Sequence, residues 1–213
     1  MRFNPAHVTR EVGPDGVEHI YVSGSLAVRV FVIFAAAYIM SYAFRAINAV
    51  IALPLVAELG LSAGQLGFLA SAYFLSFALM QLPVGVMLDR YGPRRVEAVL
   101  IGFAALGALL FAVADSYSVL WLGRALIGVG VSACLMAAVK AYSLYFRPHL
   151  QASLSSWMLV AGSLGALTVT TPVEAALPVL GWRGVFGLAA VLCVLAGLAL
   201  WFALPALFKP QKT

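Results

Sequence analysis

The stretch GVMLDRYGPRRV, residues 85–96, places one acid and three arginines within seven positions, between two long apolar runs. Only 10% of the 213 residues are charged and 63% are hydrophobic, whereas soluble domains carry about 25% charged residues. A soluble fold of this size leaves too much of its surface exposed to hide so much apolar area. The charged stretch is therefore predicted to be a short aqueous connection between two helices that cross a lipid bilayer.

Six apolar segments are long enough to cross the hydrocarbon core, which needs about 20 residues of helix. The breaks between them are rich in Pro, Gly, Ser and charged residues, as is typical of connections. The sequence thus predicts an all-α membrane protein whose six transmembrane helices span approximately residues 26–53, 65–88, 96–114, 119–142, 153–177 and 185–204.

The basic residues outside the spans predict the orientation. Nine fall on the side that carries the charged stretch, and only Arg183 falls on the other side. Because Lys and Arg are retained on the cytoplasmic side, we expect an inner (plasma) membrane protein with a cytoplasmic tail over 1–25, a six-helix bundle over 26–207 and a cytoplasmic tail over 208–213. The nine residues are Arg2, Arg10, Arg29, Arg90, Arg94, Arg95, Arg147, Lys209 and Lys212.

The first tail contains TREVGPDGVEHIYV, residues 9–22, in which a Pro-Asp-Gly turn separates two short β-prone runs. A small hairpin is one interpretation. A disordered tail is the interpretation we favour at this point, because two strands alone are marginally stable.

The charged stretch resembles the signature loop between the second and third helices of the major facilitator superfamily. LGRALIGVGVS at 122–132 resembles the fourth-helix motif of that superfamily, and LGWRGVF at 180–186 resembles the start of its sixth helix. The residues that match the signature loop are Gly85, Asp89, Arg90, Gly92, Arg94 and Arg95.

The resemblance implies two six-helix halves, each built from two inverted three-helix repeats, and this chain is similar to an N-terminal half. It implies either pairing with a second half, as a homo- or heterodimer, or a truncated product. It also implies that Asp89 belongs to a gate and faces a helix N-terminus of the opposite half, where a carboxylate is favoured. Topology anchoring is the alternative role for the arginines of the loop, which would lie beside anionic headgroups.

Three cations lie inside the predicted spans, and such residues usually face a cavity and mark a substrate path. Arg45 shares one helical stripe with polar neighbours, and Arg124 lies at a similar depth. The alternatives are a hydrogen-bonding seam between helices for Arg45 and snorkelling to headgroups for Arg124. Snorkelling is the expectation for Lys140. The candidate substrate-binding residues are Arg45, Arg124, Tyr42, Asn48 and Tyr38.

No acid is expected deep in a span, with Glu97 at the inner edge, so an anionic solute or an acid on a partner half is needed to balance Arg45 and Arg124. If transport is driven by protons, the titrating group is then expected on the partner. The stretch YAFRAINAVIALP, residues 42–54, also resembles the first helix of organophosphate–phosphate antiporters and anion–cation symporters, in which an arginine contacts the anion.

Other function classes lack the residues that they need. The histidines are far apart and no CxxC pair is present, so no metal or cofactor is expected. A clustered basic face for nucleic acid is absent, and no nucleophile–base pair or acid dyad indicates an enzyme. The predicted function is secondary active transport or exchange of a small solute, an organic anion in the first instance, by alternating access. A non-transporting membrane scaffold is the alternative, because fold alone does not fix function.

Overall fold

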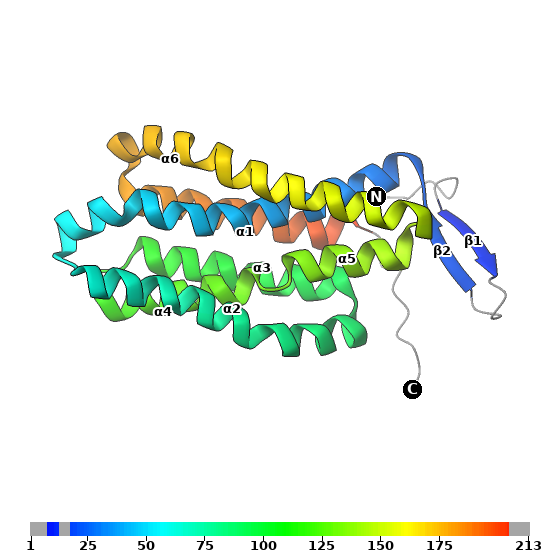
Figure 1. The fold of residues 1–213 in the computed structure, drawn as a ribbon, viewed down its shortest axis with the longest axis horizontal. Coiled ribbons are helices and arrows are strands. Elements are labelled where there is room, and N and C mark those ends of the chain that lie inside the picture. Colours follow the sequence, from blue (N-terminus) through cyan, green and yellow to red (C-terminus); the bar gives the residue numbers. More distant parts are fainter. Residues whose placement is uncertain (1–7, 13–17, 205–213) are drawn as a thin grey trace.

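The computed structural model describes residues 8–12 and 18–204. A β-hairpin precedes a bundle of helices that run along one common axis (Figure 1). The predictions made for Arg2, for the Pro-Asp-Gly turn and for residues 205–213 lie outside the described residues. The elements are β1 (Val8–Val12), β2 (Glu18–Val22), α1 (Gly24–Leu59), α2 (Ala63–Tyr91), α3 (Pro93–Ala112), α4 (Tyr117–Val131), α5 (Cys134–Tyr145), α6 (Pro148–Leu198) and a short π-helix, η2 (Ala199–Ala203).

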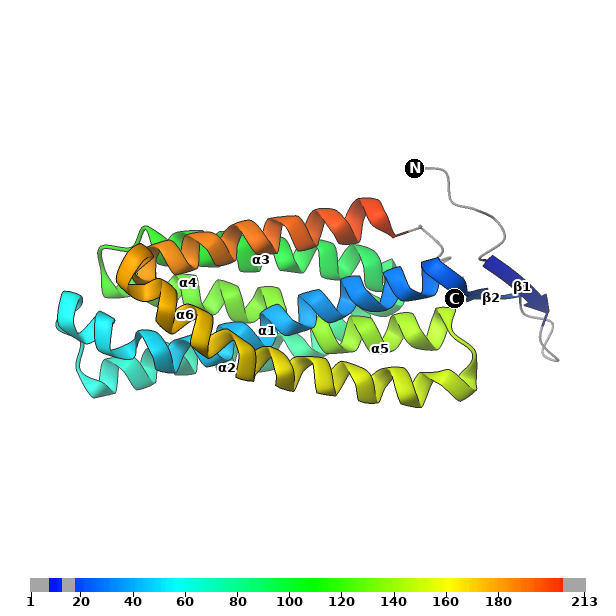
Figure 2. The same ribbon diagram turned by 90° about the horizontal axis from the view of Figure 1, so that it is seen from above.

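Five stretches of helix in the described chain are long and apolar enough to cross a membrane, and α4 with α5 counts as one of them. The last stretch, Pro148–Ala203, is not one straight helix. Gly181 has φ 64° and ψ 173°, which breaks the helix, and the chain then doubles back (Figures 1 and 2). We call residues 148–180 the first arm and residues 182–203 the second arm. The break falls inside the predicted connection between 177 and 185.

The helix connections alternate between the two ends of the bundle. The hairpin, the α2–α3 turn and the α5–α6 turn lie at one end, on the right of Figure 1. The α1–α2 turn, the α3–α4 turn and the reversal at Gly181 lie at the opposite end. The helices extend past the predicted spans at several ends. The predictions marked only the apolar part of each helix, whereas the helix itself continues into its polar ends.

The predicted span over 119–142 corresponds to one membrane-crossing stretch, Tyr117–Tyr145, in which the regular helix is interrupted at Ser132 and Ala133. The Ser132 hydroxyl donates to the backbone carbonyl of Val129 over 2.6 Å, which turns the side chain back on its own helix. The Ser132 carbonyl accepts a bond from Nε2 of Gln81 on α2 over 3.4 Å. Freed backbone groups inside a membrane need such a partner.

Small residues allow α3 and α4 to approach closely. A methyl group on Gly107 would lie 2.7 Å from both the Gly123 carbonyl oxygen and the Ile127 nitrogen. A methyl group on Gly123 would lie 2.9 Å from the Gly107 oxygen. The second arm covers the other side of α3 through Phe111 and Phe186, whose rings stack with centroids 4.1 Å apart. Such small-residue seams are the usual basis of helix packing in membranes.

The disordered tail that we favoured from the sequence is contradicted over the described residues, because β1 and β2 pair as an antiparallel hairpin. The hairpin does not stand alone. Val22 is buried, and β2 packs against α5. Glu11 forms an ion pair with Arg147, the residue just before α6, with 2.8 Å between Glu11 Oε1 and Arg147 Nη2. This support from the bundle is what an isolated two-stranded hairpin would lack.

Candidate functional site

Arg124 lies on α4 and is completely buried, with 1% of its surface exposed. Its Nη1 donates to the Phe44 carbonyl over 3.1 Å, and its Nη2 donates to the Asn48 side-chain oxygen. The guanidinium also lies against the rings of Phe111 and Phe186. The Nε group has no hydrogen-bond partner in the described chain. The alternative in which Arg124 snorkels to headgroups is therefore excluded, and no carboxylate of the described residues forms an ion pair with the buried charge.

Arg45 lies on α1 and is half-buried. Its Nε donates to the Tyr73 hydroxyl over 3.1 Å, and that hydroxyl donates in turn to the Ser41 carbonyl. The guanidinium lies 5.0 Å from the centroid of the Tyr42 ring and 4.9 Å from that of the Phe77 ring. In the described chain neither terminal nitrogen of Arg45 has a protein acceptor. Cation–π contacts of this kind stabilise the charge without neutralising it.

The remaining predicted site residues lie on the same helix. The Tyr38 hydroxyl donates to the Tyr42 hydroxyl over 3.4 Å, and the two rings meet edge to face. Both rings fill the space above Gly162 of the first arm, where a methyl group would lie 2.6 Å from Tyr38 and 2.8 Å from Tyr42. The structure thus brings Tyr38 and Tyr42 together with Arg45, whereas Asn48 lies against Arg124 instead.

Two residues of α2 belong to this site although sequence reasoning placed no binding residue there. Tyr73 and Phe77 supply the hydroxyl and one of the rings that hold Arg45. Gly128 of α4 packs directly on Tyr73, which fixes the distance between α2 and α4. The i, i+4 spacing of Tyr73 and Phe77 puts both on one face of α2, but only the fold shows that this face meets Arg45.

The charged loop turns at Gly92, which ends α2 and begins α3. Its φ of 81° is a conformation that favours glycine, and Pro93 takes the first position of α3, where its missing N–H costs nothing. The turn predicted from the sequence is confirmed. A methyl group on Gly85 would meet only the end of the Met136 side chain, at 3.9 Å. Within the described chain no neighbouring backbone approaches Gly85.

Asp89 has a partner in this chain, contrary to the expectation that it needs one from outside. Lys140 Nζ lies 2.8 Å from Asp89 Oδ1. Lys140 also does not simply snorkel to headgroups, because its amino group is used in this ion pair. The Asp89 side chain remains 71% exposed, so a second partner still has access to its carboxylate.

The arginines of the loop differ from one another. Arg94 donates through Nε to the Leu200 carbonyl over 3.3 Å and through Nη2 to the Trp201 carbonyl, and it lies over the Trp201 ring. It therefore joins the start of α3 to η2, where helix carbonyls are left open. Arg90 lies over the Tyr91 ring, and Arg95 is exposed.

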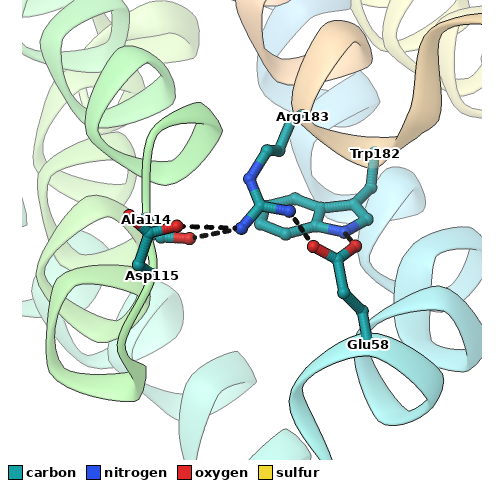
Figure 3. Close-up of polar contacts among 5 residues, drawn as sticks. All are labelled: Glu58, Ala114, Asp115, Trp182 and Arg183. Carbon is teal, nitrogen blue, oxygen red and sulfur yellow. Dashed lines mark hydrogen bonds and ion pairs between the residues drawn. The ribbon is translucent and has the colours of Figure 1, made fainter.

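A second polar cluster closes the opposite end of the bundle (Figure 3). Arg183 pairs with Glu58 at the end of α1 and with Asp115 over 3.2 Å, and it donates to the Ala114 carbonyl over 2.9 Å. The indole N–H of Trp182 donates to the other Glu58 oxygen over 2.6 Å. These five residues, which we call the Arg183 cluster, hold the ends of α1, α3 and the second arm together. Sequence reasoning placed Arg183 on the side of the membrane opposite the charged stretch but did not bring it into contact with Glu58 or Asp115.

Residues 33–213 match the sequence family described as Major Facilitator Superfamily, which is most of the chain. The chain belongs to the major facilitator superfamily. This superfamily consists of membrane transporters rather than enzymes, and the helical bundle described above is its fold. The resemblance stated from the charged loop is thereby confirmed.

Known relatives agree with this assignment. The chain is 31% identical over 217 residues to a probable nitrate/nitrite antiporter of Thermus thermophilus, covering 96% of this chain and 46% of that protein. It is 30% identical to a probable L-galactonate transporter of Escherichia coli, covering 79% of this chain and 37% of that protein. The proton:xylose symporter XylE has a similar fold, with a TM-score of 0.71 and 16% identity, covering 83% of this chain and 44% of that structure. The chain thus spans about half the length of these relatives.

Proposed function

We propose that this chain is one half of a secondary active transporter that moves a small organic anion by alternating access. The observation that carries the proposal is the pair of arginines. Arg124 is fully buried and Arg45 is half-buried, and neither forms an ion pair with an acid in the described chain. A cation inside a membrane is costly and usually has a functional counter-charge.

The polar groups around the two arginines suit an anionic solute. The free terminal nitrogens of Arg45 offer the forked donor geometry that matches a carboxylate or a sulfonate. Tyr38 and Tyr42 add hydroxyl groups beside it. The names of two relatives, a nitrate/nitrite antiporter and an L-galactonate transporter, both refer to anions, and L-galactonate is an organic one with a carboxylate. We assign Arg45 to direct solute contact and Arg124, with Asn48, to a supporting positive charge.

The proposed topology has six membrane passes, in two inverted repeats of three, with both ends in the cytoplasm. The charged loop, the α5–α6 turn and the hairpin lie at the same end of the bundle, which would face the cytoplasm under the positive-inside rule. A second six-helix half would complete the solute path. In its most apolar stretch α2 buries only 22% of its residues inside the bundle, against 61% for α4 with α5, so α2 has a face available for such a partner.

The direct test is uptake into proteoliposomes of labelled L-galactonate, nitrate and D-xylose. Arg45→Ala should raise the KM for the transported anion about tenfold to a hundredfold, because a hydrogen bond to a charged group contributes about 1.5–3 kcal/mol. Arg29→Ala, a change on the same helix but at its other end, should leave the KM near the wild-type value. Unchanged anion uptake in Arg45→Ala, or transport of D-xylose in preference to both anions, would reject this assignment.

Pairing with a second half has its own measurement. The purified chain should run in detergent as a dimer or as a complex with a second six-helix protein. A strict monomer that still transports would show that no second half is needed.

A further inference from the structure

Glu97 is the one acidic side chain in the described chain that is completely buried, with 0% of its surface exposed. It lies on α3, five residues after Gly92. Sequence reasoning placed it at the inner edge of the membrane, and the structure adds that the side chain is enclosed by the bundle there. Neither carboxyl oxygen has a hydrogen-bond partner of good geometry.

Among the residues that the structure describes, no cation pairs with Glu97. The Cys134 thiol of α5 lies within interaction range of the carboxyl, and the Tyr142 hydroxyl of the same helix lies near it. Cys193 of the second arm and Arg45 of α1 lie near Cys134, but neither acts on Glu97 directly. No ion pair in the described chain includes Glu97.

A carboxylate in such a place cannot remain ionised. An isolated charge that is removed from water and left without a partner costs many kcal/mol, whereas the neutral acid costs far less. The Tyr142 hydroxyl is itself buried without a hydrogen-bond partner. Two neighbouring polar groups that both lack partners indicate a place that water or a proton is able to enter when the helices separate.

We propose that Glu97 is a proton-binding site of this protein. In the packed arrangement seen here the carboxyl holds one proton. When water reaches the space between α3 and α5, the O–H bond breaks, the proton passes to water and a hydrated carboxylate remains. Return to the packed arrangement requires that one proton be taken up again, and no other bond changes in the cycle.

Proton binding would then be coupled to helix packing at the end of the bundle that holds the charged loop. Arg94 at the start of α3 holds η2 through its backbone carbonyls, and the Lys140–Asp89 ion pair joins α5 to α2 at that end. Opening of these contacts would admit water toward Glu97. The coupling of this step to solute movement rests on the transport function proposed above, whereas proton binding itself does not.

Infrared difference spectroscopy of the purified full chain in detergent tests the proton site without any transport. At neutral pH the wild-type protein should show the carbonyl band of a protonated carboxylic acid. The band should be absent in Glu97→Gln and present in Asp115→Asn, whose carboxyl is 92% exposed in the wild type. Cys134→Ser should shift the band, because a hydroxyl donates a stronger hydrogen bond than a thiol.

The outcomes separate the two proposals. A wild-type protein with no such band, or a band that survives in Glu97→Gln, overturns the proton site. A band that does not move in Cys134→Ser counts against the site as well, and this variant decides the matter if Glu97→Gln fails to fold. For coupling, uptake should lose its pH dependence in Glu97→Gln, and retained dependence would overturn it. If no variant or wild-type protein takes up any solute, the proposed transport function fails while the infrared result stands.

Discussion

The close seam between α3 and α4 can be tested with two alanines on one helix. Gly107 and Gly102 both lie on α3, but their surroundings differ. A methyl group on Gly107 would lie 2.7 Å from two backbone atoms of α4, whereas a methyl group on Gly102 would meet nothing within 4 Å. Normal carbon contacts are about 3.5–4.0 Å. Gly107→Ala therefore has to increase the separation of the two backbones by about 1 Å.

The pair of variants isolates the cost of this clash. Each substitution gains about 1 kcal/mol of helix propensity, and this gain is common to both. Overpacking at Gly107 should cost about 1–3 kcal/mol, because backbone atoms cannot rotate away as a side chain can. The difference in stability between the variants should therefore be about 1–3 kcal/mol, with Gly102→Ala at or slightly above the wild type.

Thermal unfolding of the purified proteins in detergent measures the difference. For a chain of this size 1 kcal/mol shifts the Tm by about 2–4 °C, so Gly107→Ala should melt between about 2 and 12 °C below Gly102→Ala. Equal melting temperatures for the two variants would show that α3 and α4 do not approach each other as described.

Two further predictions concern the charged groups. Asn48→Asp should place a carboxylate against Arg124 and so cancel one of the two positive charges. The affinity for the anion should fall at least about tenfold, or about 1.4 kcal/mol, while the circular dichroism spectrum stays unchanged. Wild-type affinity in this variant would show that Arg124 does not belong to the solute site. Asp89→Asn should slow uptake with near-normal expression, and Lys140→Met should have the same effect if the ion pair acts as a unit. Unfolding should change by no more than about 1 kcal/mol in either, because the pair is largely exposed, and loss of membrane insertion in Asp89→Asn would make its role structural.

Much of the bundle could be predicted because membrane insertion depends on local composition. The apolar runs located each helix, and Gly92 with Pro93 marked a turn that the backbone angles confirm. The break at Ser132 left no such sign, because serine and alanine are ordinary residues inside a membrane helix. Its carbonyl is satisfied by Gln81, which lies 51 residues earlier, and only the folded arrangement of α2 and α4 shows that partner.

The candidate site was predictable by residue type but not by contact. The cost of a charge in a membrane identified Arg45 and Arg124 directly from the sequence. Their environments differ because Phe44 and Asn48 of α1 enclose Arg124, while aromatic rings from α2 surround Arg45. The burial of Glu97 could not be predicted for a related reason. Its distance from the turn indicates depth along the helix, but the side on which α5 packs determines whether it meets water.

The Arg183 cluster also has a consequence for how the protein is made. Arg183 and Trp182 are 125 and 124 residues away from their shared partner Glu58. A ribosome therefore exposes the carboxylate long before it delivers either donor. Glu58 lacks its two partners Trp182 and Arg183 until the second arm has been synthesised. A nascent chain that stalls before that point lacks the contact between α1 and the second arm. The contact that joins α1 to the second arm is therefore among the last to form during synthesis of residues 24–203.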